Sequence, residues 1–203
     1  MIVTELIPLT KNRYKVYIDN EFAFVLYKGE LHMYHIEVGC DISETDYEEI
    51  TQKVLPKRAK LRAMNLLQKK TYTEKQLVDK LREGFYPESS VQEAIAYVKS
   101  YHYVDDLRYA LDYITYHQAS KPLNRIRDDL FRKGIAKDVL EAAMVKWEEQ
   151  GGENDELSMV NLHLQKKGYA DNMERKEKQR IYAYLLRKGF SVETITKAMK
   201  NLT

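Results

Sequence analysis

The chain has 203 residues, of which 44% are apolar and 32% are charged, and its net charge is +2. This length allows one or two compact domains or a short array of repeats. The single cysteine, Cys40, excludes an internal disulfide, which fits a reducing compartment. No apolar run approaches the roughly 20 residues that span a bilayer, and the N-terminus lacks the pattern of a signal peptide. We therefore expect a soluble, cytoplasmic protein without a membrane partner.

The first 55 residues are predicted to form a small sheet followed by short helices. Three stretches are predicted strands, because they alternate in polarity or are rich in β-branched and aromatic residues: 2–7, 13–18 and 21–27. Asp19 and Asn20 tolerate a positive φ, so a two-residue turn and a β-hairpin are expected. One or two helical turns should follow at 28–35, and a helix at about 44–54. Residues 1–55 are therefore assigned to an N-terminal β-hairpin with a short helix.

Helices dominate the rest of the chain, and one helix-ending pattern occurs three times. An apolar, a basic and a charged residue precede a glycine, and an apolar residue follows it, at Gly84, Gly134 and Gly189, which are 50 and 55 residues apart. Glycine suits the left-handed position that ends many helices. A period near fifty with helical content predicts a mostly α fold, an elongated curved array of three tandem three-helix repeats behind the N-terminal β-hairpin or sheet. The repeats are assigned to residues 56–103, 104–150 and 151–203.

Capping residues mark several helix starts within the repeats. Thr73 and Gln76 match a capping box, in which each side chain satisfies a backbone N–H near the other. Asp105 is a good N-cap, and Pro122 suits the first turn of the next helix. Ser191 should cap the last helix, whose predicted apolar stripe is Val192, Ile195, Met199 and Leu202.

Patterns that carry catalysis or bind metal are missing from the sequence. It contains no glycine-rich phosphate loop and no histidine or cysteine pairs at metal-ligand spacing. Two acidic pairs could be metal ligands or acid–base partners: Asp105-Asp106 and Asp128-Asp129. A helix cap explains the first pair better, and the second lies at i,i+4 spacing to basic residues, as on many helix surfaces. We therefore predict no catalytic residue, no metal site and no cofactor.

Clustered bases are the positive feature of the sequence. Residues 1–55 carry 5 Lys/Arg against 10 Asp/Glu, a net charge of −5, whereas residues 56–103 carry 10 against 5, a net charge of +5. Arg58 and Arg62 lie at i,i+4 spacing, as do Lys176 and Arg180, and we predict that no acid offsets either pair. Such neighbours destabilise an isolated helix by a few tenths of a kcal/mol, and a negatively charged partner would compensate for it.

In the middle repeat, Arg127 has no acid at i±4 and Lys121 is predicted to have none nearby, so both are expected to reach outward. The simpler alternative is that all these bases only solvate exposed helix faces. The predicted partner-binding residues are Lys57, Arg58, Lys60, Arg62, Lys121, Arg127, Arg175, Lys176, Lys178 and Arg180.

Six of the 16 tyrosines cluster around the junction of the first two repeats: Tyr97, Tyr101, Tyr103, Tyr109, Tyr113 and Tyr116. Exposed rings could stack on unpaired bases of a nucleic acid. The preferred interpretation is that the rings fill gaps between thin helical layers and keep their hydroxyl groups at the rim.

Several of these segments together resemble the RecX family, the regulatory proteins of the RecA recombinase. Residues 103–110 read Tyr-Val-Asp-Asp-Leu-Arg-Tyr-Ala, which looks like the family's signature, and residues 125–135 are similar to its second-repeat helix. Residues 64–67 and 73–84 look like its first repeat. The hairpin is similar to the N-terminal extension of members from low-GC Gram-positive bacteria. One departure is Lys121-Pro122-Leu123, where members often show Lys-Gly-Pro.

The resemblance implies a non-enzymatic modulator, an inhibitor, that binds in the groove of the RecA filament on single-stranded DNA. It would limit ATP hydrolysis, strand exchange and filament growth, and so take part in DNA repair and the SOS response. Weak direct contact with DNA is a further option, and the closed repeat pattern favours a monomer. A stand-alone helical nucleic-acid-binding module and a structural adaptor remain alternatives.

Overall fold

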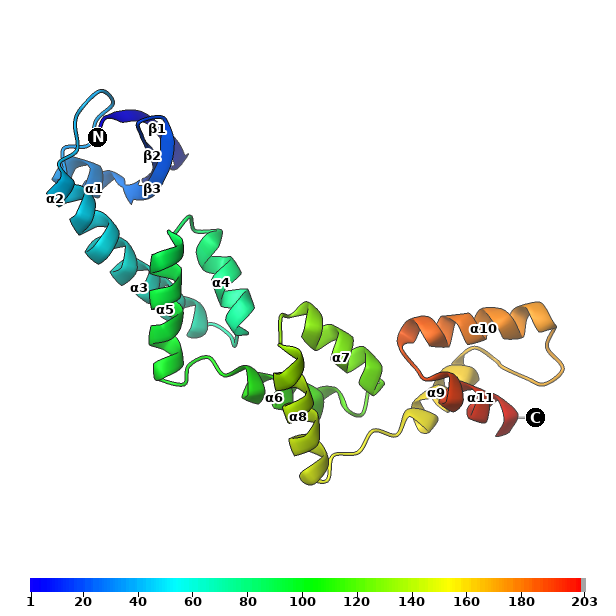
Figure 1. Ribbon diagram of the computed structural model, residues 1–203. Coiled ribbons are helices and arrows are strands. Elements are labelled where there is room, and N and C mark those ends of the chain that lie inside the picture. The colour runs from blue at the N-terminus through cyan, green and yellow to red at the C-terminus, as the bar shows by residue number, and fades with distance from the viewer. Residues whose placement is uncertain (202–203) are drawn as a thin grey trace. The chain divides into compact units, whose positions relative to one another are not determined.

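The computed structural model describes residues 1–201 and divides into two compact units, Met1–Val104 and Asp105–Thr203 (Figure 1). The predicted mostly helical fold with a small N-terminal antiparallel sheet is confirmed. Leu202, predicted for the stripe of the last helix, lies outside the described residues. The curvature of the array and its repeat boundaries stay predictions.

Three antiparallel strands open the first unit: β1 (Val3–Thr10), β2 (Arg13–Ile18) and β3 (Glu21–Tyr27), in the order β1-β2-β3. Asp19 and Asn20 join β2 to β3 with φ values of 49° and 70°, so both central residues of the turn are left-handed. This conformation matches the twist of the flanking strands, and the predicted hairpin is confirmed.

One helical rod connects the sheet to the first repeat. After α1 (Lys28–Met33), α2 (Glu44–Glu49) begins at the cap Ser43 and continues through a π-helical segment, η1 (Ile50–Val54), into α3 (Leu55–Leu67). The predicted helix end near residue 54 is therefore wrong. The helix passes Pro56 because Leu55 donates its backbone N–H to the carbonyl of Ile50, five residues back, so the ladder has already changed register where proline lacks a donor.

The first repeat consists of α3, α4 (Glu74–Arg82) and α5 (Glu88–Ser100) around one apolar core (Figure 1). The predicted capping box of Thr73 and Gln76 opens α4. Gly84 does not adopt the predicted left-handed conformation; Phe85 does, with a φ of 63°. A Cβ on Gly84 would lie 2.9 Å from the ring of Tyr86, so this glycine is needed for space. Contact of the Phe85 ring with Lys15, at 4.4 Å, holds the strained residue.

The second unit contains two further helix triplets. The first is α6 (Asp106–His117), α7 (Leu123–Arg132) and α8 (Lys137–Glu149), and the second is α9 (Glu156–Lys166), α10 (Arg175–Lys188) and α11 (Val192–Asn201). Each triplet has its own apolar core. Asp105 and Ser191 cap α6 and α11 as predicted, since they accept hydrogen bonds from the backbone N–H groups of Arg108 and Thr194. Gly134 and Gly189 have the predicted left-handed conformation, with φ values of 90° and 97°.

Polar contacts join the two triplets of the second unit. Asn154, between α8 and α9, donates its side-chain amide to the carbonyl groups of Gln118 and Lys121 in the loop before α7. The backbone N–H of Leu123 donates to Glu156 over 3.1 Å. A Cβ on Gly189 would lie 3.0 Å from Cβ of Arg125, so glycine allows the end of α10 to approach α7 closely.

Candidate partner-binding surfaces

Arg58, the predicted centre of the α3 cluster, is part of the packing of the first unit. Its side chain is only 16% exposed, and its guanidinium donates to Glu30 of α1 over 2.6 Å and to the carbonyl of Val25 in β3. The same group lies 4.9 Å from the ring centroid of Tyr27. The prediction that no acid offsets Arg58 is therefore wrong, because Glu30 approaches from an element 28 residues earlier.

The other α3 bases divide into one paired lysine and two unpaired residues. Lys60 forms an ion pair of 2.6 Å with Glu93 of α5 and lies 5.5 Å from the ring of Tyr97. Lys57 and Arg62 are exposed, and neither forms an ion pair with any residue from 1 to 201. Only these two of the four predicted residues stay available to a partner.

Lys121 belongs to a polar cluster centred on Asp129 of α7. Its ammonium group donates to Asp129 and to the hydroxyl of Tyr113, both over 2.9 Å, and Tyr113 donates to Asp129 over 3.0 Å. Arg125 approaches the same carboxylate at 3.3 Å, and Arg132 also contacts it. The prediction that Lys121 has no acid nearby is wrong, because the loop before α7 brings it back over that helix.

The electrostatics of this cluster favour a charged carboxylate. Burial alone raises the pKa of Asp129, but the hydrogen bonds from Lys121 and Tyr113 and the nearby positive charges lower that pKa from 3.8 to about 2. Burial likewise lowers the pKa of Lys121, whereas its bonds to Tyr113 and Asp129 raise it, with a net rise. The cluster therefore stays ionised at neutral pH and stabilises the second repeat.

Arg127 is only weakly paired. Its guanidinium lies 3.5 Å from Glu141 of α8, and both side chains are well exposed. The sequence pattern missed this acid because it lies on another helix. Exposed pairs of this kind contribute about 0–1 kcal/mol, so Arg127 can exchange Glu141 for another anion at little cost.

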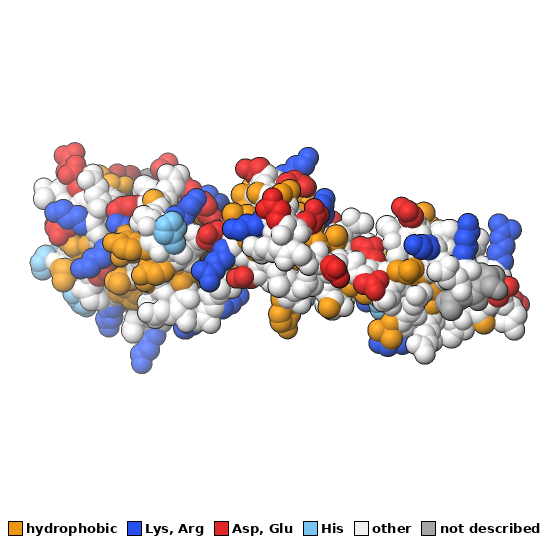
Figure 2. All heavy atoms as spheres, turned by 90° about the horizontal axis from the view of Figure 1, so that it is seen from below, with side chains coloured by type: hydrophobic (Ala, Val, Ile, Leu, Met, Phe, Trp, Pro, Cys, Tyr) orange, Lys and Arg blue, Asp and Glu red, His pale blue; other side chains and the backbone are white. Residues whose placement is uncertain are grey.

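The start of α10 carries the largest unpaired group among the predicted residues. Lys178 donates to Asp171 over 2.8 Å. Arg175, Lys176 and Arg180 are exposed and make no ion pair within the described part of the chain. Figure 2 shows basic side chains interspersed with acidic ones on the face that it presents. The unpaired bases therefore form small groups.

The tyrosines serve two different purposes. Tyr109 and Tyr113 pack against the core of the second repeat, which confirms the gap-filling interpretation for them. That interpretation is wrong for Tyr101 and Tyr103, which are 58% and 52% exposed and stack with ring centroids 5.8 Å apart. Tyr116 is exposed as well. The sequence position of Tyr101 and Tyr103 could have indicated this exposure, because both residues follow the last apolar turn of α5.

The described residues contain neither a membrane-spanning helix nor a metal-binding cluster. Within residues 1–201, no helix combines the length and apolar character that a bilayer crossing requires. Over the same residues, no group of three or more His, Cys, Asp or Glu side chains is arranged to hold a metal ion.

The fold and these surfaces define a protein of tandem three-helix domains that displays small groups of unpaired bases. Residues 59–97 match the first three-helix domain of RecX, and residues 155–199 match its third three-helix domain. A regulatory protein RecX from Caldanaerobacter subterraneus is 32% identical to the chain, and the match covers 100% of both proteins. The chain belongs to the RecX family.

Further relatives and solved structures agree. Regulatory protein RecX from Clostridium beijerinckii is 25% identical over 100% of this chain and 95% of its own. A crystal structure of regulatory protein RecX superposes with a TM-score of 0.63 at 22% identity, over 98% of both chains. RecX from Lactobacillus salivarius gives a TM-score of 0.59 at 22% identity, over 73% of this chain and 97% of that one. Both structures share the fold.

Proposed function

We propose that this protein regulates the RecA recombinase by binding, without chemistry, in the groove of the RecA filament on single-stranded DNA. It would limit ATP hydrolysis, strand exchange and filament growth, acting as a monomer in the cytoplasm. The observation that carries the proposal is the end-to-end match to a regulatory protein RecX at 32% identity. The signature at residues 103–110 supports the same assignment.

The unpaired bases supply a physical basis for binding an anionic filament. Lys57 and Arg62 in the first unit, and Arg175, Lys176 and Arg180 in the second, are exposed without an ion pair among the described residues. Contact with phosphate groups or acidic side chains would relieve their mutual repulsion and release counterions from a nucleic acid. We exclude Arg58 and Lys121 from the proposed contacts, because they form ion pairs within the protein, with Glu30 and Asp129.

The acidic pairs support a role without catalysis. Asp105 accepts a hydrogen bond from the backbone N–H of Arg108 as the cap of α6, and Asp129 is held by basic partners that keep it charged. The lowered pKa keeps the carboxylate of Asp129 from exchanging a proton with a substrate near neutral pH. The relatives' name, regulatory protein, agrees with this role.

A second candidate function is a stand-alone nucleic-acid-binding module. The stacked, exposed rings of Tyr101 and Tyr103 favour it, because such rings bind unpaired bases with little sequence preference. This function would require no recombinase.

A titration into RecA filaments distinguishes the two functions. ATP hydrolysis by RecA on single-stranded DNA is followed while the protein is added, and binding to the naked DNA is measured in parallel. Regulation of RecA predicts that hydrolysis falls at protein concentrations at which little naked DNA is bound. Unchanged hydrolysis together with tight binding to naked DNA would establish the stand-alone module instead.

A further inference from the structure

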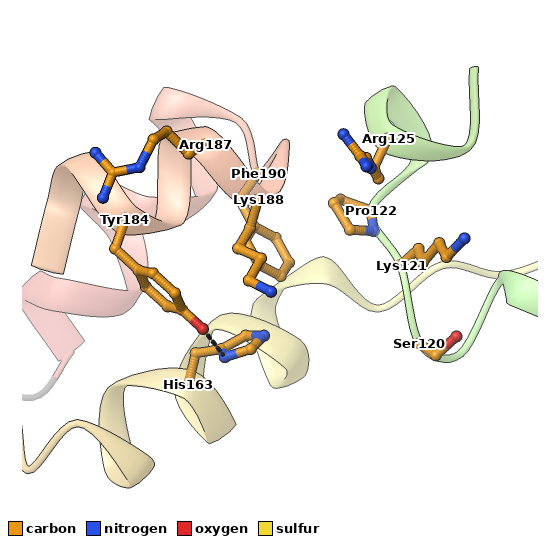
Figure 3. Close-up of a pocket in the computed structure, with 9 residues that line it drawn as sticks. All are labelled: Ser120, Lys121, Pro122, Arg125, His163, Tyr184, Arg187, Lys188 and Phe190. Atoms are coloured by element: carbon orange, nitrogen blue, oxygen red, sulfur yellow. Dashed lines mark hydrogen bonds between the residues drawn. The ribbon is translucent and has the colours of Figure 1, made fainter. Parts of the chain in front are cut away.

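A cationic cavity lies between the two helix triplets of the second unit. It has a volume of about 620 Å³, within the usual range of ligand sites. Figure 3 shows its two sides: Lys121 and Arg125 lie on the α7 side, and Tyr184, Arg187 and Lys188 of α10 lie on the other, with His163 of α9 below them. None of its arginines was among the residues predicted from the sequence to bind a partner.

The backbone around the cavity is fixed by contacts described above. Gly189 turns the chain directly after Lys188, and its missing Cβ lets this turn approach Arg125. The side chain of Asn154 holds the loop that carries Lys121 by two hydrogen bonds to its carbonyl groups. The two cationic sides are thus brought together by the fold and not by attraction between them.

Positive charge dominates the cavity. Asp129 is the carboxylate that neutralises the α7 side, and it is shared by Lys121, Arg125 and Arg132. Neither Arg187 nor Lys188 forms an ion pair with any residue from 1 to 201, although Lys188 lies 5.6 Å from the ring of Tyr184. Four bases therefore line the cavity, and no carboxylate is among the described residues that line it. In Figure 3 the ammonium group of Lys188 points into the cavity, whereas the guanidinium of Arg187 and the ammonium group of Lys121 point away from it.

His163 reports this excess of positive charge. Burial lowers its pKa first, and the charges of Lys188, Lys166 and Lys167 lower it further, so the imidazole is neutral at pH 7. Its Nδ1 lies 3.3 Å from the hydroxyl of Tyr184. Lys166 and Lys167 share its helix, Lys188 and Tyr184 face it from α10, and Lys121 and Arg125 line the same cavity from the α7 side. An anion bound here would reverse the effect and raise the pKa of His163.

We propose that this cavity binds a phosphate group of single-stranded nucleic acid, with Lys188, which already points into it, and Arg187, whose exposed side chain turns toward the bound phosphate, as its principal donors. A guanidinium and an ammonium group that lack carboxylate partners match phosphate oxygens, and binding would release counterions. The cavity has room for more than a carboxylate, and the aromatic rings of Tyr184 and His163 beside the bases can take a neighbouring nucleobase. These rings favour a nucleic acid over an acidic peptide.

The test uses the full-length chain and a short, fluorescently labelled oligothymidylate, without RecA. Its outcome therefore does not depend on the regulation of RecA proposed above. Fluorescence anisotropy compares the wild type, the double variant Arg187→Ala/Lys188→Ala, and the control double variant Lys146→Ala/Lys197→Ala. Lys146 and Lys197 are exposed and lie outside the cavity, so both double variants lose the same charge.

The cavity variant should bind roughly tenfold more weakly or worse, and the slope of log affinity against log salt concentration should fall by about 1.4, the value for two lost contacts to a single strand. The control variant should stay within about twofold of the wild type. Equal losses in both variants, or no binding of the wild type at low salt, would overturn the proposal.

Nuclear magnetic resonance of His163 gives an independent readout. Addition of the oligothymidylate should raise the pKa of His163 in the wild type, and this rise should be lost when Arg187 and Lys188 are replaced. Polyglutamate serves as the competing probe. Should polyglutamate raise the pKa of His163 while the oligothymidylate leaves it unchanged, the cavity is a site for acidic protein segments and the assignment to nucleic acid is wrong.

Discussion

Replacing Arg58 with alanine should destabilise the first unit far more than a surface change. The variant leaves the carboxylate of Glu30 and the carbonyl of Val25 without their donor, and the side chains of Arg58 and Glu30 are only 16% and 22% exposed. Breaking a fully buried ion pair costs about 3–5 kcal/mol, and partial exposure reduces this to about 2 kcal/mol. For a urea dependence of about 2 kcal/mol per molar, the unfolding midpoint should fall by about 1 M.

Urea unfolding with two optical probes checks this value. Far-UV circular dichroism follows the whole chain, whereas the fluorescence of Trp147, the single tryptophan, follows the core of the second repeat. The loss of stability should lower the unfolding midpoint seen by circular dichroism. The midpoint seen by tryptophan fluorescence should change little, since Arg58 and Glu30 both lie within Met1–Val104. Arg62→Ala is the matched control and should change stability by less than about 0.5 kcal/mol.

Comparing the unfolding midpoints of these two variants shows whether Arg58 has a structural role. If Arg58→Ala and Arg62→Ala unfold at the same urea concentration, the ion pair with Glu30 contributes nothing and our reasoning is refuted. A double-mutant cycle with Glu30→Gln measures the pair itself, and a coupling energy near zero would have the same consequence.

Three further changes test other parts of the structure. Asp129 has its pKa lowered to about 2 in the folded protein, so its charged carboxylate contributes about 2 kcal/mol to the free energy of unfolding above pH 4. This contribution is lost as the pH falls to 2. Asp129→Asn should remove this pH dependence, with unfolding followed by the fluorescence of Trp147. Reversing the charges of Arg175, Lys176 and Arg180 to Glu should weaken the proposed inhibition of RecA ATP hydrolysis at least tenfold and flatten its salt dependence. Inhibition equal to that of the wild type would remove α10 from the proposed interface. Gly152→Ala would place a Cβ 2.2 Å from the ring of Trp147, so it should lower stability by about 1–3 kcal/mol and alter tryptophan fluorescence, and an unperturbed spectrum would contradict the close contact.

Features set by neighbouring residues were predictable from the sequence. The hairpin turn at Asp19 and Asn20 and the caps at Thr73 and Asp105 depend on short-range hydrogen bonding and allowed φ values. The repeated glycine pattern predicted the helix triplets for the same reason. The three-helix domains at residues 59–97 and 155–199 agree with it.

Contacts between elements were not predictable in this way. Residues at i,i+4 spacing lie on the same helix, so this spacing could not indicate Glu30 beside Arg58 or Glu141 beside Arg127, because both acids lie on other helices. Lys121 lies outside a helix, where that spacing has no meaning. Phe85 takes the left-handed position in place of Gly84 because tertiary contacts of its ring with Lys15 and Phe22 outweigh the local preference.

The rod formed by α2, η1 and α3 has a consequence for how the first unit comes apart. Ile50 and Leu55 belong to the core beneath the sheet, and Ala59 and Ala63 belong to the core of the first repeat. Unfolding of this continuous helical rod would disrupt both cores, so the two cores should unfold in one cooperative transition and not one after the other. Cleavage by a protease near residue 55 would likewise separate the helix that packs against the sheet from the helix that packs in the first repeat, and both cores should then unfold.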